Sequence, residues 1–307
     1  MKRALVVAAP LAAGGVALAA RRRGRAPVIE PSGEIRVIDG ERIHIVDRGD
    51  GPAIVLIHGF LGNTASWRFV IDDLSHNHRV VALDLPGFGF SERDPGADLS
   101  HEAHARRTAR VMDELGIDRA TIVGHSMGGG IAQRFAVQFP DRTGRLVLLC
   151  AVNAGVRPDW GRRGKGAKPF MAGMRVLARW PSLTNRLTLR TMREIVADPD
   201  RLTAEDAWLY TAPLLQRGTV ACIESMLRSV REEEPADLSR ITAPTLVLSG
   251  ECDTAVPPAV GATIAAAIPG ARAHVWPGVG HLPAEEDPAA FLEQLRAFVA
   301  EHAVTAA

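Results

Sequence analysis

The stretch "ATIVGHSMGGGIAQRFAVQF", residues 120–139, contains the strongest indication of a fold in this chain. Its first five residues form an apolar run typical of a buried strand, and the residues from 127 onward have the pattern of a helix. Between them stands Ser126, in the pattern G-x-S-x-G. A turn this tight forces the serine into strained backbone space and leaves room only for small residues two positions before and after it. The stretch therefore predicts a serine hydroxyl lifted clear of a sheet, at the N-terminus of a helix.

The segments on either side predict a mostly parallel sheet of eight strands. The runs 35–38 and 42–46 are separated by Asp39-Gly40, a pair that favours a hairpin. Further apolar runs predict strands, besides 120–124, at 53–57, 79–83, 145–150, 244–250 and 272–276. Helical patterns alternate with them near 100–115, 127–138, 257–267 and 288–301. Such alternation indicates a doubly wound α/β fold with helices on both faces and the hairpin as its antiparallel edge.

The alternation stops between residues 153 and 240. This segment contains helical patterns around 169–180, 183–197, 203–216 and 218–232 and no convincing strand. We interpret it as an all-helical lid inserted after the sixth strand, over the carboxyl edge of the sheet, where ligands bind in open α/β folds. The core is then formed by residues 28–152 and 241–307.

Composition excludes several classes of protein. The chain has 307 residues, 47% hydrophobic and 23% charged, which suits a soluble globular protein. Its formal net charge is +1, but six basic residues lie in the first 25 positions, so the remainder carries −5 and offers no basic field for nucleic acid. The three cysteines are scattered and suggest neither a disulfide framework nor a metal site, so we expect all three to be buried: Cys150, Cys222 and Cys252.

Residues 1–27 have the character of a targeting segment. The uncharged run 4–20 is at the short end of what crosses a bilayer, where about 20 residues are usual. The arginine cluster that follows opposes translocation. We therefore expect membrane association through residues 4–20, with the catalytic domain on the cytoplasmic face. The alternative is export after cleavage, because Ala17-Leu18-Ala19 has the form of a signal-peptidase site.

From about residue 30 to 302 the sequence resembles the α/β-hydrolase fold superfamily, in its lidded subgroup of serine esterase-like enzymes. The resemblance rests on five motifs, each just after a predicted strand or before a helix: "HGF" (58–60), "DLPGFGFS" (84–91), "GHSMGG" (124–129), "GECDTAVP" (250–257) and "GVGHLPAEEDP" (278–288). It implies a catalytic triad in the order serine, acid, histidine.

Ser126 needs a base that takes its proton during attack. The resemblance implies His281, in the loop before the last helix. The competing histidines are His58, which we expect to fix loop structure, His125, at the variable position of the turn, and His274, in the middle of a strand. His101 and His104 have a spacing that could bind a metal, but we expect them to lack a carboxylate partner or a third ligand.

The base in turn needs a carboxylate that holds its tautomer. The resemblance implies Asp253, with Glu251 as the rival two residues earlier. Asn153 falls at an alternative acid location used by some relatives, but it has no charge.

Two backbone N–H groups are expected to form an oxyanion hole: those of Met127, which follows the nucleophile, and Phe60, in "HGF". Phe60, Trp180 and Leu209 are candidate contacts for an apolar substrate.

The "DLPGFGFS" stretch lacks the third glycine of a dinucleotide loop, so we expect no cofactor. We also expect no metal, and assign Asp84 to bracing this loop.

The resemblance, with a serine at the turn, leaves four classes of function. The leading prediction is hydrolysis of a carboxylic ester or lactone of small to medium apolar character through an acyl-serine intermediate. Carbon–carbon hydrolysis of dienoate ring-cleavage products is the alternative, although the arginine usual before the acid is replaced by Cys252. Cofactor-free perhydrolysis is a third class. A non-enzymatic scaffold is the fourth and is disfavoured, because every triad residue is present.

Overall fold

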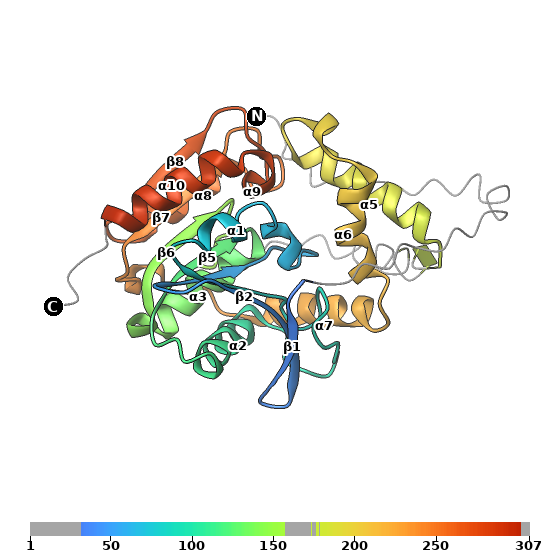
Figure 1. Ribbon diagram of the computed structural model, residues 1–307, viewed down its shortest axis with the longest axis horizontal. Helices are drawn as coiled ribbons and strands as arrows, with labels where there is room; N and C mark the ends of the chain where they lie inside the picture. The colour runs from blue at the N-terminus through green and yellow to red at the C-terminus, as the bar shows by residue number, and fades with distance from the viewer. Residues whose placement is uncertain (1–31, 157–172, 174–175, 178, 302–307) are drawn as a thin grey trace.

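The eight strands form one sheet in the order β1-β2-β4-β3-β5-β6-β7-β8 (Figure 1). The structure is a computed structural model and describes residues 32–156, 173, 176–177 and 179–301. The strands are β1 (Glu34–Ile38), β2 (Glu41–Arg48), β3 (Ala53–Ile57), β4 (Arg79–Leu83), β5 (Ala120–His125), β6 (Thr143–Leu149), β7 (Thr245–Gly250) and β8 (Arg272–Trp276). The predicted fold class, a mostly parallel eight-stranded α/β sheet, is confirmed.

The first two strands form the antiparallel edge that the sequence predicts. Ile38 pairs with Glu41 across a two-residue turn, in which Asp39 has φ 51° and Gly40 has φ 81°. Positive φ at both central positions matches the right-handed twist of the flanking strands, which is why this pair suits a hairpin. β2 then pairs antiparallel with β4, and all remaining pairs are parallel.

Each central strand is buried on both sides. In β3, Val55 and Ile57 face one hydrophobic cluster, while Ile54 and Leu56 face another. Every such side chain contributes about 1.5–3 kcal/mol by leaving water, so a continuous apolar run is stable only under two layers of helices. The first cluster is covered by α2 (His101–Glu114), α3 (Met127–Gln138) and α8 (Pro258–Ala267). The second is covered by η1 (Thr64–Trp67), α1 (Ile71–Leu74) and α10 (Pro288–Glu301).

Between β6 and β7 the chain leaves the sheet. The described residues 179–240, called the insertion below, contain helices and no strand (Figure 1). Its elements are α5 (Pro181–Ile195), η4 (Pro199–Arg201), α6 (Ala204–Leu214), α7 (Thr219–Glu232) and η5 (Leu238–Arg240). Three of the four predicted helices are therefore present, each within two residues of its predicted bounds. Most of the fourth, 169–180, lies outside the described residues.

A buried polar network joins the insertion to the core. The Tyr210 hydroxyl of α6 donates to Glu285 of α9 (Pro283–Glu286) and lies 3.2 Å from the Ser66 hydroxyl of η1. Arg68 donates to both Glu285 and Asp206, at 2.6 and 2.9 Å. Burial raises the pKa of Glu285, and the Arg68 charge opposes that rise. Because a buried charge without a partner is costly, this network fixes where α6 can lie.

Two expectations about other parts of the chain have different outcomes. Cys150 and Cys222 are buried as predicted, but Cys252 is exposed, so the prediction for that thiol is wrong. The reason is its place: β7 ends at Gly250, and Cys252 lies in the loop beyond it. The predicted targeting segment, residues 1–27, lies outside the described residues. Within the part that the structure describes, no helix is long and apolar enough to span a bilayer.

Candidate active site

Ser126 occupies the sharp turn between β5 and α3. Its φ of 52° and ψ of −116° place a non-glycine residue in backbone space that costs about 1–3 kcal/mol. The surrounding backbone offsets this strain: the Ser126 N–H donates to Leu149 O at 2.9 Å, and its carbonyl accepts from Gly129 and Val152. The strained serine predicted from the sequence is therefore present.

The small residues around the serine are required by close approach of the backbone. A Cβ at Gly124 would lie 2.3 Å from the carbonyl oxygen of Gly128, and a Cβ at Gly128 would lie 2.3 Å from that of Ile57. A Cβ at Gly59 would lie 3.0 Å from Cβ of Ser126. Because carbon and oxygen atoms that are not bonded to each other stay more than 3 Å apart, no larger side chain fits the first two positions.

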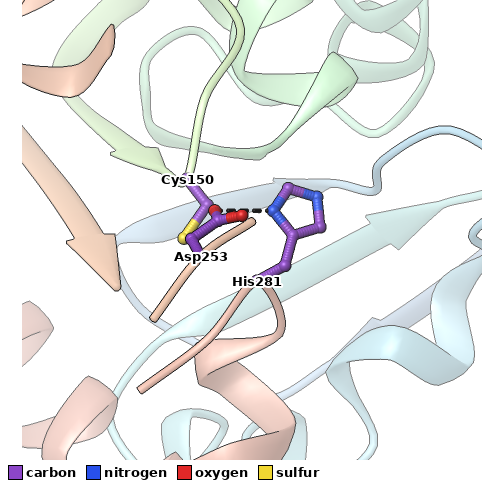
Figure 2. Close-up of side chains that lie close together, drawn as sticks. All are labelled: Cys150, Asp253 and His281. Atoms are coloured by element: carbon purple, nitrogen blue, oxygen red, sulfur yellow. Dashed lines mark hydrogen bonds and ion pairs between the residues drawn. The ribbon is translucent and has the colours of Figure 1, made fainter. Parts of the chain in front are cut away.

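The structure brings the three predicted catalytic side chains into one chain of hydrogen bonds. His281 Nε2 lies 3.0 Å from Ser126 Oγ, and His281 Nδ1 lies 2.7 Å from Asp253 Oδ2. Figure 2 shows the contact between the carboxylate and the imidazole. All three residues are buried. Since a carboxylate only accepts, Nδ1 carries the proton and Nε2 is free to accept from the serine hydroxyl.

Asp253 rather than Glu251 contacts the histidine. Asp253 Oδ1 accepts from the N–H groups of Ala255 and Val256, at 2.8 Å each, which leaves Oδ2 for His281. Glu251 is exposed and accepts from Gly278 N at 3.1 Å. The two carboxylates of this loop therefore differ in what they can do: one orients the imidazole and the other closes a turn.

Cys150, for which the sequence predicts only burial, is a neighbour of the site. The thiol follows β6, where its residue has φ 45°, and it donates to Gly280 O at 3.7 Å. Figure 2 shows it beside Asp253. Burial raises the pKa of this thiol well above its usual value, and Asp253 raises it further. Asn153, the expected alternative acid position, instead accepts from Gly155 N within a turn.

The ligand atoms of Cys150, Asp253 and His281 lie within 4.8 Å of one another, which raises the question of a metal site. A thiol, a carboxylate and an imidazole are ligands that suit Zn²⁺. Zinc–ligand bonds of about 2.0–2.1 Å in a tetrahedron hold neighbouring nitrogen and oxygen ligands about 3.3 Å apart. Nδ1 and Oδ2 are only 2.7 Å apart, the length of a hydrogen bond that shares one proton. As arranged, the cluster orients an imidazole.

The residues expected to form the oxyanion hole lie on either side of Ser126. Met127 is the first residue of α3, where an N–H has no acceptor within its own helix and the helix dipole favours negative charge. Phe60 follows Gly59, which packs against Ser126, and its half-buried ring lies 6.0 Å from that of Phe88. An anion that forms at the serine is therefore close to the start of α3.

Comparison with known proteins agrees with this architecture. The model of the family described as alpha/beta hydrolase fold matches residues 52–288. The chain belongs to this family. A 2-hydroxy-6-oxo-6-phenylhexa-2,4-dienoate hydrolase of Burkholderia cepacia is 30% identical over 264 residues, which cover 81% of this chain and 88% of that protein.

Two solved structures are also similar to this hydrolase. A variant of the meta-cleavage product hydrolase from Pseudomonas fluorescens IP01 has a TM-score of 0.73 and 27% identity, with coverage of 88% of this chain and 98% of that one. An N-acyl homoserine lactone degrading enzyme has a TM-score of 0.70 and 26% identity, with coverage of 87% and 100%. The chain is therefore an α/β-fold hydrolase whose relatives include enzymes that act on different bonds.

The three histidines that compete with His281 by sequence have contacts that fit structural roles. His58 Nε2 accepts from Leu85 N at 3.0 Å, and its Nδ1 donates to Gly59 O, so it joins two loops. His125 Nε2 donates to His281 O at 2.7 Å, and burial lowers the pKa of His125 to about 3. His274 packs edge-on against Trp276 in β8.

His101 and His104 differ from their expected surroundings. Glu233, which caps the far end of α7, lies 3.6 Å from His101 Nδ1, so a carboxylate is present after all. Burial lowers the pKa of His101 to about 4 and that of His104 well below its usual value. Among the described residues, however, the cluster at Cys150 is the only convergence of three metal-type ligands. The pair therefore remains without a third ligand.

The "DLPGFGFS" loop is braced by Asp84, in agreement with the interpretation of that stretch. Asp84 accepts from the N–H groups of Thr64 and Phe90, at 2.6 and 2.7 Å, and from His44 Nδ1 at 2.8 Å. Its side chain is fully buried. A carboxylate with this many donors is held in place, and it lies apart from the triad.

The predicted substrate contacts outside the triad have varied positions. Leu209 packs against the buried cluster of the insertion, and its carbonyl accepts from Asn63 at 2.9 Å. Trp180 immediately precedes α5 and is 43% exposed. Contact of these side chains with a substrate remains a prediction.

Proposed function

We propose that this hydrolase cleaves a carboxylic ester or lactone of small to medium apolar character through an acyl-serine intermediate. The observation that supports it most directly is the relay Ser126–His281–Asp253, with distances of 3.0 and 2.7 Å, at the start of a helix. Such a relay converts a weak nucleophile into one that attacks a carbonyl.

In the first half of the reaction, Ser126 Oγ attacks the carbonyl carbon while its proton passes to His281 Nε2. The oxygen of the tetrahedral intermediate takes the negative charge and accepts from the N–H groups of Phe60 and Met127, each of which contributes on the order of 10²–10³ in kcat. Asp253 stabilises the imidazolium. When the intermediate collapses, the bond to the alkoxide breaks, and His281 returns the proton to that leaving group.

In the second half, water replaces the alcohol. His281 takes a proton from water, the resulting hydroxide attacks the acyl carbon, and the proton goes to Ser126 Oγ as the acid departs. No oxidant or cofactor is consumed. We also propose that the insertion acts as a lid, because its elements contact η1, the loop after β4 and the loop of the catalytic histidine.

Hydrolysis of a carbon–carbon bond in a dienoate is the second candidate, because the Burkholderia cepacia and Pseudomonas fluorescens relatives carry such names. A dienoate substrate is a carboxylate and favours a site with an available cation. The arginines in the segments after β3 and β4 are engaged elsewhere: Arg68 bonds Glu285 and Asp206, and Arg93 donates to Thr219 and three backbone carbonyls. This favours the neutral ester or lactone.

The test compares p-nitrophenyl esters of two to eight carbons, an acyl lactone and a dienoate ring-cleavage product on the purified chain. We expect turnover of the ester or lactone, and loss of at least about 10⁴-fold in kcat for Ser126→Ala with an unchanged unfolding temperature. Covalent labelling of Ser126 by an organophosphate should disappear in the same variant. Turnover of the dienoate alone would support the second candidate, and wild-type activity in Ser126→Ala would reject the mechanism.

A further inference from the structure

We propose that Glu286 is a positioning residue for His281. The carboxylate of Glu286 holds the loop that carries the histidine and also binds the insertion to that loop. The histidine loop is defined here as residues 277–282, between β8 and α9. The proposal rests on hydrogen bonds between Glu286, this loop and the end of α5. Its activity test, but not its structural test, depends on the proposed function.

Glu286 accepts hydrogen bonds from both neighbours of the catalytic histidine. Oε2 accepts from Gly280 N at 2.9 Å, and Oε1 accepts from Leu282 N at 2.9 Å. The N–H of His281 itself points to the insertion, where Ile195 O accepts it at 2.8 Å. The three consecutive N–H groups that surround the imidazole are thus held by one carboxylate and one carbonyl. Hydrogen bonds to an ionised acceptor are roughly twice as strong as neutral ones.

The same carboxylate holds the insertion. Glu286 Oε2 also accepts from Ala197 N at 2.8 Å, two residues after α5 ends, and the Glu286 carbonyl accepts from Arg201 at 2.5 Å. The two segments are so close that a Cβ on Gly280 would lie 2.6 Å from Ile195 O and 2.8 Å from Ala197 N. Glycine at 280 is therefore what allows the end of α5 to reach the histidine loop.

A second contact brings the acid loop into the same arrangement. Thr254, next to Asp253, donates from its hydroxyl to Glu194 O in the last turn of α5 at 3.0 Å. The end of α5 consequently touches the loops of both the base and the acid. Displacement of about 1 Å at a catalytic group can cost on the order of 10² in rate, so the seating of α5 affects the relay directly.

Glu285 provides a matched comparison one residue away. Its side chain also joins the insertion to the core, but through Tyr210 of α6 and Arg68, and the hydrogen bonds described for this carboxylate do not include the histidine loop. If fastening the insertion were all that matters, the two adjacent glutamates would have equivalent effects. If Glu286 positions His281, only its replacement affects the histidine loop.

The structural test is hydrogen exchange on the full chain, read by mass spectrometry for Glu286→Ala, Glu286→Gln and Glu285→Gln. In Glu286→Ala we expect faster exchange, by at least about tenfold, in both the histidine loop and residues 195–201, because three N–H groups lose their acceptor. Glu286→Gln keeps one carbonyl oxygen for Gly280 and Ala197 and should show a smaller increase. Glu285→Gln should accelerate exchange in α6 and leave the histidine loop unchanged.

The activity test uses the ester that the wild-type chain turns over. We expect Glu286→Ala to lower kcat by about 10- to 100-fold with KM within about threefold, because the relay is displaced while the substrate site is intact. Glu286→Gln should recover most of that loss, and Glu285→Gln should stay within about threefold of the wild type. If Glu286→Ala does not fold, Glu286→Gln against Glu285→Gln decides the question.

Wild-type exchange of the histidine loop in the Glu286 variants, or equal acceleration in Glu285→Gln, would overturn the proposal. An inactive wild-type chain would reject the proposed ester chemistry, yet the exchange results would still decide whether Glu286 holds the loop. The two failures are therefore distinguishable.

Discussion

The proposed nucleophile and the proposed base of this hydrolase are held in different ways. Ser126 is held by residues close to it in the sequence: the strand before it and the helix after it. The glycines of this turn leave room for backbone carbonyl oxygens at positions that a Cβ would occupy. His281 is fixed by groups from elsewhere, including Asp253 from the loop after β7 and Ile195 from the insertion. The serine thus depends on local backbone geometry, and the histidine depends on the assembly of distant segments.

Besides the contact between Ser126 and His281, a second hydrogen bond joins these two arrangements. His125, next to the nucleophile, donates from Nε2 to the carbonyl of His281. Substitutions near Ser126 and substitutions near His281 should therefore have different effects on stability and activity. A change at the glycines of the serine turn should affect stability together with activity, whereas a change around the histidine should affect activity more than stability.

The largest effect on kcat is expected from a substitution of Asp253, the carboxylate that contacts His281. Asp253→Asn should lower kcat by about 10⁴-fold, because the amide oxygen would accept from Ala255 N and Val256 N, and the NH2 group would then face His281 Nδ1 and favour the wrong tautomer. Glu251→Gln, in the same loop, should change kcat by less than about twofold, since Glu251 is exposed and its carboxylate accepts from Gly278 N rather than from His281. Steady-state kinetics with the same ester measures both. A large loss in Glu251→Gln would transfer the acid role to that residue.

The next effect tests the nucleophile side through packing. Gly128→Ala places a Cβ 2.3 Å from the Ile57 carbonyl, which cannot move without the strand, so we expect a loss of about 3 kcal/mol or more in the free energy of unfolding. Gly130→Ala is the control, because its Cβ would meet a Val152 methyl at 2.8 Å, and alanine gains up to about 1 kcal/mol in helix propensity. Urea unfolding measures both. Equal midpoints for the two variants would show that close backbone approach does not select glycine at 128.

The smallest effect concerns pH and the far end of the insertion, where His101 meets Glu233. Burial lowers the pKa of His101 to about 4, so below pH 6.5 the unfolded chain binds a proton that the folded chain does not. The free energy of unfolding is therefore highest above pH 6.5 as far as His101 is concerned. It falls as the pH decreases toward 4, by on the order of 1 kcal/mol per pH unit. Unfolding temperatures between pH 7.5 and 5 should therefore fall less steeply for His101→Gln. An unchanged slope would mean that folding does not lower the pKa of His101.

The same contrast explains what could be predicted from the sequence. The sheet, its hairpin and the serine turn follow from short-range patterns, because a strand buried on both faces must be apolar and a sharp turn must be small. The ends of α5 and α6 were predicted within two residues. Cys252 was placed wrongly, since composition favours burial of cysteine but its loop position exposes the thiol.

The hydrogen bonds that hold the loop of His281 could not be predicted from short-range patterns. Glu286 and Ala197 are far apart in the sequence, and backbone N–H groups leave no mark on residue identity. For Cys150 the sequence predicts only burial, because nothing in a single sequence indicates that the residue after β6 lies beside the acid loop. Only the family resemblance pointed to His281 and Asp253, through motifs rather than periodicity.

The contact between α6 and the core contains a natural spectroscopic probe, the side chain of Tyr210. Tyr210 is the only tyrosine among 307 residues, and it is buried in contact with Glu285 and Ser66. Any signal specific to a phenol, such as its absorbance on ionisation or its nitration, therefore comes from this one joint. Burial and the Glu285 charge also raise the pKa of Tyr210 well above its usual value, so ionisation near pH 10 would signal that α6 has come away from its seat.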